Sequence, residues 1–171
     1  MDDFKKIIIP ILGVIVFIVF VGLIYNKDKT KIPFLTKPNT EEKSNNTVDV
    51  KIGSVTIKAL LANNEKLRKK GMGGTKQLDE DEGMLFVFDE KDIIPSFWMK
   101  DMLIAIDILW IDNGKIIQID KDIKPPQKDT PDKDLAQYTP KKPVDYVLEV
   151  GGGYSDKKGI KEGDDVGIPN L

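Results

Sequence analysis

Two charged residues stand in the most apolar stretch of this sequence outside its N-terminus, and they are the first candidates for chemistry. Lys100 follows Phe97-Trp98-Met99, and Asp107 lies within 104–111, a run rich in β-branched and aromatic residues. A strand over 104–111 places Asp107 in a row of otherwise apolar side chains. Because a buried carboxylate is costly unless it is paired or hydrogen-bonded, Asp107 must meet a partner. The sequence leaves three options open: backbone N–H groups, an ion pair with Lys100 or Arg68, or the floor of a ligand pocket.

The candidate ligand-binding residues are Asp107, Lys100, Trp98 and Arg68. Lys100 could hold an anionic or hydroxyl-rich ligand, and Trp98 could serve as a platform for a sugar ring or another flat group. Each also has an ordinary structural role: Trp98 as part of the core, and Lys100 and Arg68 as solvated cations. Glu149 is a second carboxylate, and period two puts it on a strand face whose ends we expect to be wet. If Glu149 and Asp107 are within reach of each other, the pair could hydrolyse a glycosidic bond.

The composition excludes several classes of chemistry. The chain of 171 residues contains no cysteine and no histidine. Catalytic triads of the Ser-His-Asp or Cys-His kind, thiol nucleophiles and thiolate metal sites therefore cannot be built, and we predict neither a metal site nor a cofactor. The 26 basic and 28 acidic residues nearly balance, so binding to nucleic acid is not expected.

The first 47 residues divide into three parts. Residues 1–6 form a polar head, 7–25 are uncharged and almost wholly apolar, and 26–47 are rich in Lys, Thr, Asn, Glu and Pro. A helix over 7–25 is long enough to cross a hydrocarbon core of about 30 Å. We therefore predict a single-pass anchor in the lipid bilayer, followed by a flexible linker. The alternative is a cleaved signal peptide, but no small-x-small cleavage site follows the apolar run.

The orientation of this anchor rests on two conflicting signals. Lysines lie on both sides of the apolar run, and more of them follow it than precede it, at 27, 29, 31 and 37. The positive-inside rule would then keep the C-terminal part in the cytoplasm. An N-terminal apolar segment that precedes a whole domain usually acts as an export signal, so we predict an extracytoplasmic domain.

The remaining residues, 48–171, predict one globular β-rich domain. Alternation over 48–52 and 55–61 around Gly53-Ser54 indicates a hairpin, and Asp112-Asn113-Gly114 turns 104–111 into a second hairpin with 115–119. Further strands are expected at 83–88 and 144–150. A short helix should begin at Asn63 or Asn64 and end at Gly71. Six or seven short strands and one clear helix favour a mainly β fold, with an antiparallel sheet packed into a sandwich or partial barrel.

Several of these segments, in the same order, resemble the domain-of-unknown-function 192 family. The resemblance runs from about Val55 to Ile168 and rests on the following segments: Arg68 with Gly71-Met72, 83–88, Phe97-Trp98-Met99-Lys100, Asp107-Ile108, 146–150 and Gly163-Asp164. This chain departs from the family pattern at Asp101-Met102, Ala105-Ile106 and Gly151-Gly152-Gly153. The resemblance implies a small, mostly β fold, often behind an export signal or membrane anchor, and it implies no reaction.

Three hypotheses for function follow. The first is a membrane-tethered module of the cell envelope that binds a small molecule or glycan. The alternative is an envelope hydrolase or lyase that uses Asp107 with Lys100 or Glu149. The third is a structural domain that places a surface near the membrane. The sequence contains no nucleophile motif, and that favours the first.

Overall fold

The computed structural model describes residues 47–169. The predicted anchor at 7–25, and the linker up to residue 46, lie outside the described residues. Within 47–169 there is no helix long and apolar enough to span a bilayer.

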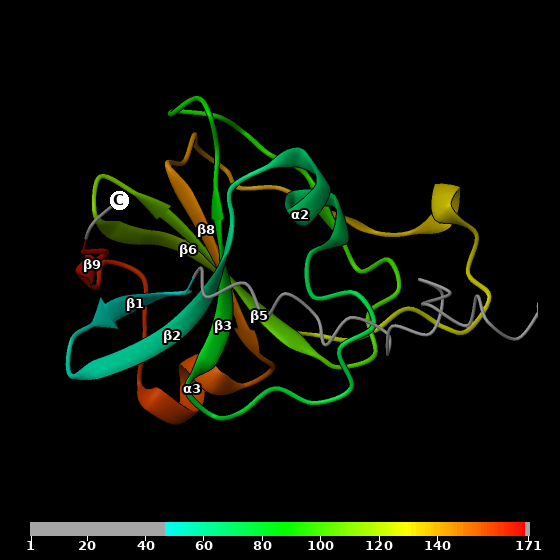
Figure 1. The fold of residues 1–171 in the computed structure, drawn as a ribbon, viewed down its shortest axis with the longest axis horizontal. Helices are drawn as coiled ribbons and strands as arrows, with labels where there is room; N and C mark the ends of the chain where they lie inside the picture. The colour runs from blue at the N-terminus through cyan, green and yellow to red at the C-terminus, as the bar shows by residue number, and fades with distance from the viewer. Residues whose placement is uncertain (1–46, 170–171) are drawn as a thin grey trace, which may run out of the picture. The chain divides into compact units, whose positions relative to one another are not determined.

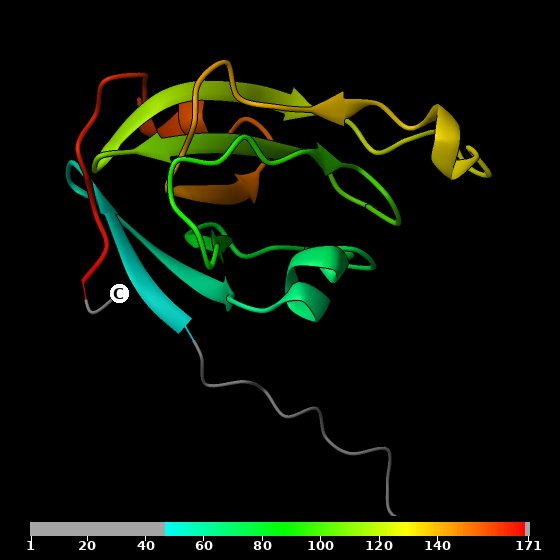
Figure 2. The ribbon, with the colours of Figure 1, turned by 90° about the horizontal axis from the view of Figure 1, so that it is seen from above.

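The described residues form a sheet of seven strands in the order β6-β5-β8-β3-β2-β1-β9. Its strands are β1 (Thr47–Ile52), β2 (Val55–Ala62), β3 (Glu82–Val87), β5 (Ile106–Asp112), β6 (Lys115–Ile123), β8 (Tyr146–Gly151) and β9 (Val166–Gly167). All neighbouring strands are antiparallel except β2 and β3. The sheet curls strongly, with β1 and β2 turned away from β5 and β6 (Figures 1 and 2). The predicted mainly β fold and partial barrel are thus confirmed.

Smaller elements complete the fold. Strands β4 (Phe97–Trp98) and β7 (Gln137–Tyr138) pair in a separate two-stranded sheet. Helix α2 (Glu65–Lys70) lies in the connection between the parallel strands β2 and β3, and helix α3 (Tyr154–Lys158) follows β8. A single 3₁₀ turn, η2 (Asp132–Asp134), lies in the long segment between β6 and β7. This segment projects from one end of the sheet, as Figure 2 shows at its right-hand side.

Both predicted hairpins are present, and their turns explain why. The β1–β2 turn uses Gly53 at a φ of 57°, and the β5–β6 turn uses Asn113 and Gly114 at 48° and 67°. Glycine and asparagine tolerate this left-handed backbone better than other residues do. The second hairpin differs from the expectation in its extent. Strand β5 begins at Ile106, two residues late, and β6 continues to Ile123, well into the expected loop.

The sheet is buried on both faces, which is why β5 reads as a continuous apolar run. One core contains Leu109 and Ile111 of β5, together with Leu148 and Val150 of β8. The other core contains side chains from alternate positions of the same strands, including Ile108 and Val147, and buries methionines and aromatic residues of the loops above them. The segments that cover the second face therefore decide what surrounds the site described below.

Asp107 joins three parts of the fold through its carboxylate. It is fully buried on the face of Leu109 and Ile111. Oδ1 accepts hydrogen bonds from the backbone N–H groups of Asp122 at 2.7 Å and Gly153 at 2.9 Å, and Oδ2 accepts one from Ser155 at 2.8 Å. These bonds cap the start of α3 and satisfy the N–H left free where β6 bulges against β5. Of the three options left open by the sequence, backbone hydrogen bonding is the one observed.

Two glycines allow this arrangement. Gly153 has a φ of 77°, and a Cβ atom on Gly152 would lie 2.8 Å from the Cβ of Ala105. A side chain at Gly152 would therefore push the α3 connection away from β5. The glycine run after β8 is needed to bring the α3 N–H groups to Asp107.

We expect Asp107→Asn to destabilise the domain by about 3 kcal/mol, because the amide presents an NH₂ group to N–H donors in a buried site. The melting temperature of the full chain in detergent should fall by roughly 10 °C. Asp49→Asn is the matched control, since Asp49 is exposed on β1 and loses the same charge. An equal, small change in both variants would contradict a structural role for Asp107.

Candidate functional site

A cleft with a volume of about 310 Å³ lies between α2, the end of β3 and residues 95–102. Arg68, Trp98 and Lys100, three of the four residues predicted to bind a ligand, line it together. They come from separate parts of the chain, Arg68 from α2 and the other two from and beside β4. Asp107, the fourth, does not line this cleft.

The period of two in Phe97-Trp98-Met99-Lys100 explains how Trp98 and Lys100 reach the cleft. Phe97 packs edge-on against Phe86 and Trp110, with ring centroids at 4.8 and 5.5 Å, and Met99 is only 4 % exposed. These two side chains fix the segment to the core. The alternate side chains, Trp98 and Lys100, turn outward, and Trp98 is 37 % exposed.

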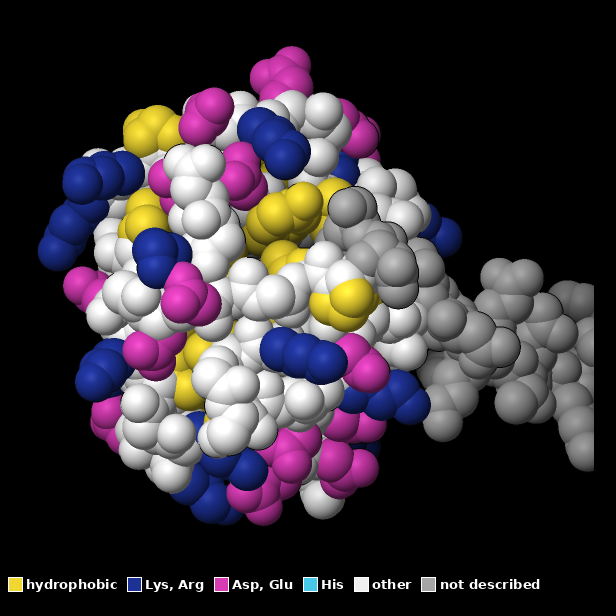
Figure 3. All heavy atoms as spheres, turned by 90° about the vertical axis from the view of Figure 1, so that its left-hand side faces the viewer, with side chains coloured by type: hydrophobic (Ala, Val, Ile, Leu, Met, Phe, Trp, Pro, Cys, Tyr) yellow, Lys and Arg dark blue, Asp and Glu magenta, His cyan; other side chains and the backbone are white. Residues whose placement is uncertain are grey.

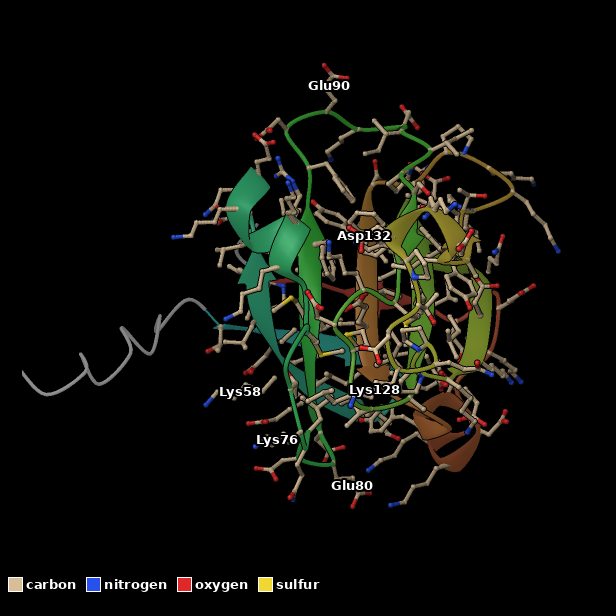
Figure 4. All side chains as sticks on the ribbon, turned by 90° about the vertical axis from the view of Figure 1, so that its right-hand side faces the viewer. Lys58, Lys76, Glu80, Glu90, Lys128 and Asp132 are labelled. Carbon is tan, nitrogen blue, oxygen red and sulfur yellow. The ribbon has the colours of Figure 1, made fainter. Side chains whose placement is uncertain are left out.

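The Lys100 ammonium is held in place by an acidic partner that is distant in sequence. It forms an ion pair with Asp132 of η2, 32 residues away, and lies 5.6 Å from the centre of the Trp98 ring. Figure 4 faces the side from which the β6–β7 segment projects and labels Asp132 near the centre of the view. The hydrogen bond to Asp132 raises the pKa of Lys100, so this group stays charged at neutral pH.

Arg68 is fixed to the end of β3. Its guanidinium donates to the carbonyl of Val87 at 2.9 Å and to Asp89 at 3.1 Å, and lies 5.9 Å from the centre of the Phe88 ring. A planar group held in this way keeps one orientation at the cleft wall. Neither Arg68 nor Lys100 pairs with Asp107. Each of these two cations has a different acidic partner, Asp89 for Arg68 and Asp132 for Lys100.

Glu149 lies at the floor of the cleft, although it was not among the residues predicted from the sequence to bind a ligand. Glu149 lies on β8 between Met84 of β3 and Ile108 of β5, and it is 4 % exposed. Within residues 47–169 its Oε2 has no hydrogen-bond partner. Burial raises the pKa of this carboxyl to about 8, so it is mostly protonated at neutral pH.

The expectation that Glu149 lies on a wet strand face was wrong. The cleft around Glu149 is lined by buried apolar side chains from outside β8, namely Met72, Phe86 and Met102. The period-two pattern correctly puts Glu149 on the side of buried Val147, but it cannot show what covers that side. Glu149 shares a face with its cross-strand partner Ile108, whereas Asp107 points to the opposite face. The structure therefore does not bring the two carboxyl groups together.

The fold and the cleft define a small, mainly β domain with an aromatic cleft, cations at its rim and a buried acid at its floor. The chain belongs to the family DUF192, described as "Uncharacterized ACR", whose model matches residues 47–168. No curated protein matches it.

Two solved structures are similar to this chain over most of the described residues. One is a Sinorhizobium meliloti 1021 protein described as a "putative transcription regulator", with 27 % identity and a TM-score of 0.65 over 73 % of this chain and 95 % of that one. The other is a protein of unknown function from Novosphingobium aromaticivorans DSM 12444. It has 27 % identity and a TM-score of 0.63, over 71 % of this chain and 84 % of that one.

The Glu149 carboxyl should make the stability of the domain depend on pH. Its pKa rises from 4.5 to about 8 on folding, so between these values the folded state binds more protons than the unfolded state. The free energy of unfolding should then decrease as pH rises, by about 1.4 kcal/mol per pH unit, until Glu149 ionises in the folded state.

Glu149→Gln should remove this contribution. Thermal unfolding followed by tryptophan fluorescence between pH 5 and 9 measures it, as the difference between the full-length protein and the variant. Parallel curves for the two proteins would show that Glu149 is not held neutral by burial.

Proposed function

We propose that this chain is a membrane-tethered binding protein of the cell envelope, whose cleft takes a small organic anion with a ring. The observation that supports it most is the convergence of Arg68, Trp98 and Lys100 on one cleft. Two of these residues come from one short segment, but Arg68 lies 30 residues before Trp98. Side chains that merely meet solvent have no need to converge in this way.

The charge of the cleft favours an anion. Arg68, Lys69, Lys70 and Lys100 line it, against Glu65 and the mostly protonated Glu149. An anionic ligand can pair with these cations without leaving a buried charge unpaired. Asp132 already neutralises part of this charge, so the ligand would share or displace that contact at Lys100.

The shape of the cleft favours a ring. Phe86, Phe88, Phe97 and Trp98 contribute to its walls, and Trp98 remains partly exposed. Aromatic walls with a few placed polar groups are typical of small-molecule sites, and a volume of about 310 Å³ lies at the lower end of their range. A ligand of the size of one sugar or one aromatic acid fits this description better than a polymer does.

Nucleic acid is a weaker candidate. The chain has a net charge of −2, and Figure 3 shows acidic and basic side chains interspersed over the face that it views. Proteins that bind nucleic acid usually concentrate basic residues to contact phosphates. The geometry does not support the alternative of a hydrolase or lyase that uses Asp107. Both oxygens of this carboxylate already accept hydrogen bonds from backbone N–H groups, three in all.

The binding proposal is tested by thermal shift of the full chain in detergent with a panel of small organic acids. Binding to the native state raises its melting temperature. Lys100→Gln and Arg68→Gln should each weaken the affinity for an acid that binds by tenfold or more, which corresponds to about 1.4 kcal/mol. Lys58→Gln is the matched control, because Lys58 lies on β2 outside the cleft and is labelled in Figure 4. An equal loss of affinity in all three variants would show that the acid does not bind in the cleft.

The membrane proposal rests on the apolar run at 7–25, and its orientation can be tested by cysteine labelling, since the chain has no native cysteine. Ser54→Cys introduces a thiol in the exposed β1–β2 turn, and Asp3→Cys introduces one before the apolar run. In intact cells a membrane-impermeant maleimide should label the Ser54→Cys variant only, and after lysis it should label both. If only the Asp3→Cys variant is labelled in intact cells, the orientation is the opposite of the one proposed. If the unmodified chain is recovered in the soluble fraction without detergent, the proposed membrane anchor is wrong.

A further inference from the structure

Glu149 is a polar group that the sheet does not need. Its neighbours in register are Met84 and Ile108, and Val147 precedes it on the same face of β8. Any apolar side chain of similar size would complete this row. Yet Glu149 is buried to 4 % exposure, and its Oε2 meets no hydrogen-bond partner among the described residues. Glu149 is one of the residues that line the cleft.

The charged groups around the cleft do not compensate Glu149. Arg68 is engaged by Val87 and Asp89, and Lys100 by Asp132. The remaining charged residues of the lining, at 65, 69 and 70, are exposed on α2. On β5, the neighbouring strand, Asp107 faces the other core. Burial raises the pKa of Glu149 to about 8, and no residue within 47–169 forms an ion pair that would oppose this shift. The group is therefore a carboxylic acid at neutral pH, able to donate through O–H and to accept at the other oxygen.

We propose that Glu149 is the inner contact for the ligand, that it binds as a neutral carboxylic acid, and that the ligand is a sugar acid. This inference rests on the proposed binding function and narrows its ligand. The carboxylate of the sugar acid would meet Lys100 and Arg68 at the rim, and the ring would lie against Trp98. A hydroxyl group would exchange hydrogen bonds with Glu149 at the floor.

The rim of the cleft carries cations and its floor carries a neutral acid, and this difference favours a ligand with its charge at the rim. An amine at the floor could ionise Glu149, but its carrier would have to pass a rim where four cations outnumber the carboxylate of Glu65. A simple aromatic acid would satisfy the rim and the walls while leaving Glu149 without a partner. A sugar acid carries a charge for the rim and several hydroxyl groups for the floor on one ring.

Matched sugars test the ligand class. D-Glucuronate and D-galacturonate carry the charge, D-glucose lacks it, and D-glucosamine reverses it on a similar ring. Isothermal titration of the full chain in detergent should show at least one uronate binding tenfold or more tightly than glucose, and glucosamine binding no better than glucose. Binding of glucosamine as tight as that of the uronates would overturn the proposal, and so would a failure of both uronates to bind.

Two variants test the role of Glu149 itself. Glu149→Gln keeps the shape and both hydrogen-bonding functions without the ability to ionise, so uronate affinity at pH 7 should stay within about threefold of the wild type. Above pH 8 the wild type should lose affinity as Glu149 ionises, while the Gln variant should not. Glu149→Leu should bind the uronate tenfold or more weakly, yet melt at or above the wild-type temperature, because it removes an unpartnered buried group.

The outcomes separate this inference from the function on which it rests. If the Gln variant loses binding as the Leu variant does, the ligand meets an ionised Glu149 and the inference is wrong. If both variants bind the uronate as the wild type does, Glu149 is not a contact, although the cleft still binds. If another organic acid binds in a manner that depends on Lys100 and no uronate does, the sugar-acid inference fails and the binding function stands. If no acid of either panel binds, both fail.

Discussion

The three backbone hydrogen bonds accepted by Asp107 hold together elements that the sheet alone would leave apart. A carboxylate can be fully buried only when its oxygens are satisfied, and here the donors come from β6 and from the start of α3. The bulge in β6 and the start of the short helix α3 each leave backbone N–H groups without a partner in the sheet or helix. One side chain satisfies both, so the positions of α3 and β6 relative to β5 depend on it. The close approach of Gly152 to Ala105 is the steric condition for the same contact.

The two faces of the sheet are used differently. On one face, both carboxylate oxygens of Asp107 accept hydrogen bonds, and the surrounding side chains form an apolar core. The opposite face holds Glu149, a buried carboxyl with an unpartnered oxygen, beneath a cleft. A folded domain loses stability by keeping such a group, and this one belongs to a residue that lines the cleft. The contrast between two acidic residues on neighbouring strands, one satisfied and one not, is the main reason for placing function on the second face.

The aromatic residues connect the core to the cleft. Phe97 contacts Phe86 and Trp110 on its inner side, and its neighbour Trp98 faces outward. Because β4 is only two residues long, this packing and the pairing with β7 hold Trp98 and Lys100 in place. The β6–β7 segment thus contributes twice, through β7 beside Trp98 and through Asp132 at Lys100. Its conformation bears directly on the cleft, although it lies far from α2 in the sequence.

Much of the architecture could be predicted from local patterns in the sequence. Alternation and turn residues predicted both hairpins, the mainly β sheet and the helix ending at Gly71, because these features depend on neighbouring residues. The motif pattern predicted the family. It also identified Arg68, Trp98 and Lys100, which the tertiary structure brings to one cleft. The membrane anchor stays a prediction, since it lies outside the described residues.

The partner of each charged side chain could not be predicted from the sequence, because it depends on how distant segments fold together. Asp107 had several partners within its reach in the sequence, and it accepts hydrogen bonds from N–H groups 15 to 48 residues away. Lys100 pairs with an aspartate 32 residues on, in a segment that the sequence showed only as a charged loop. The same holds for the burial of Glu149. The period-two pattern predicts which face of β8 carries this side chain, but the loops that bury that face come from elsewhere in the chain. Local patterns report the conformation of the backbone, whereas burial and pairing depend on contacts between distant segments.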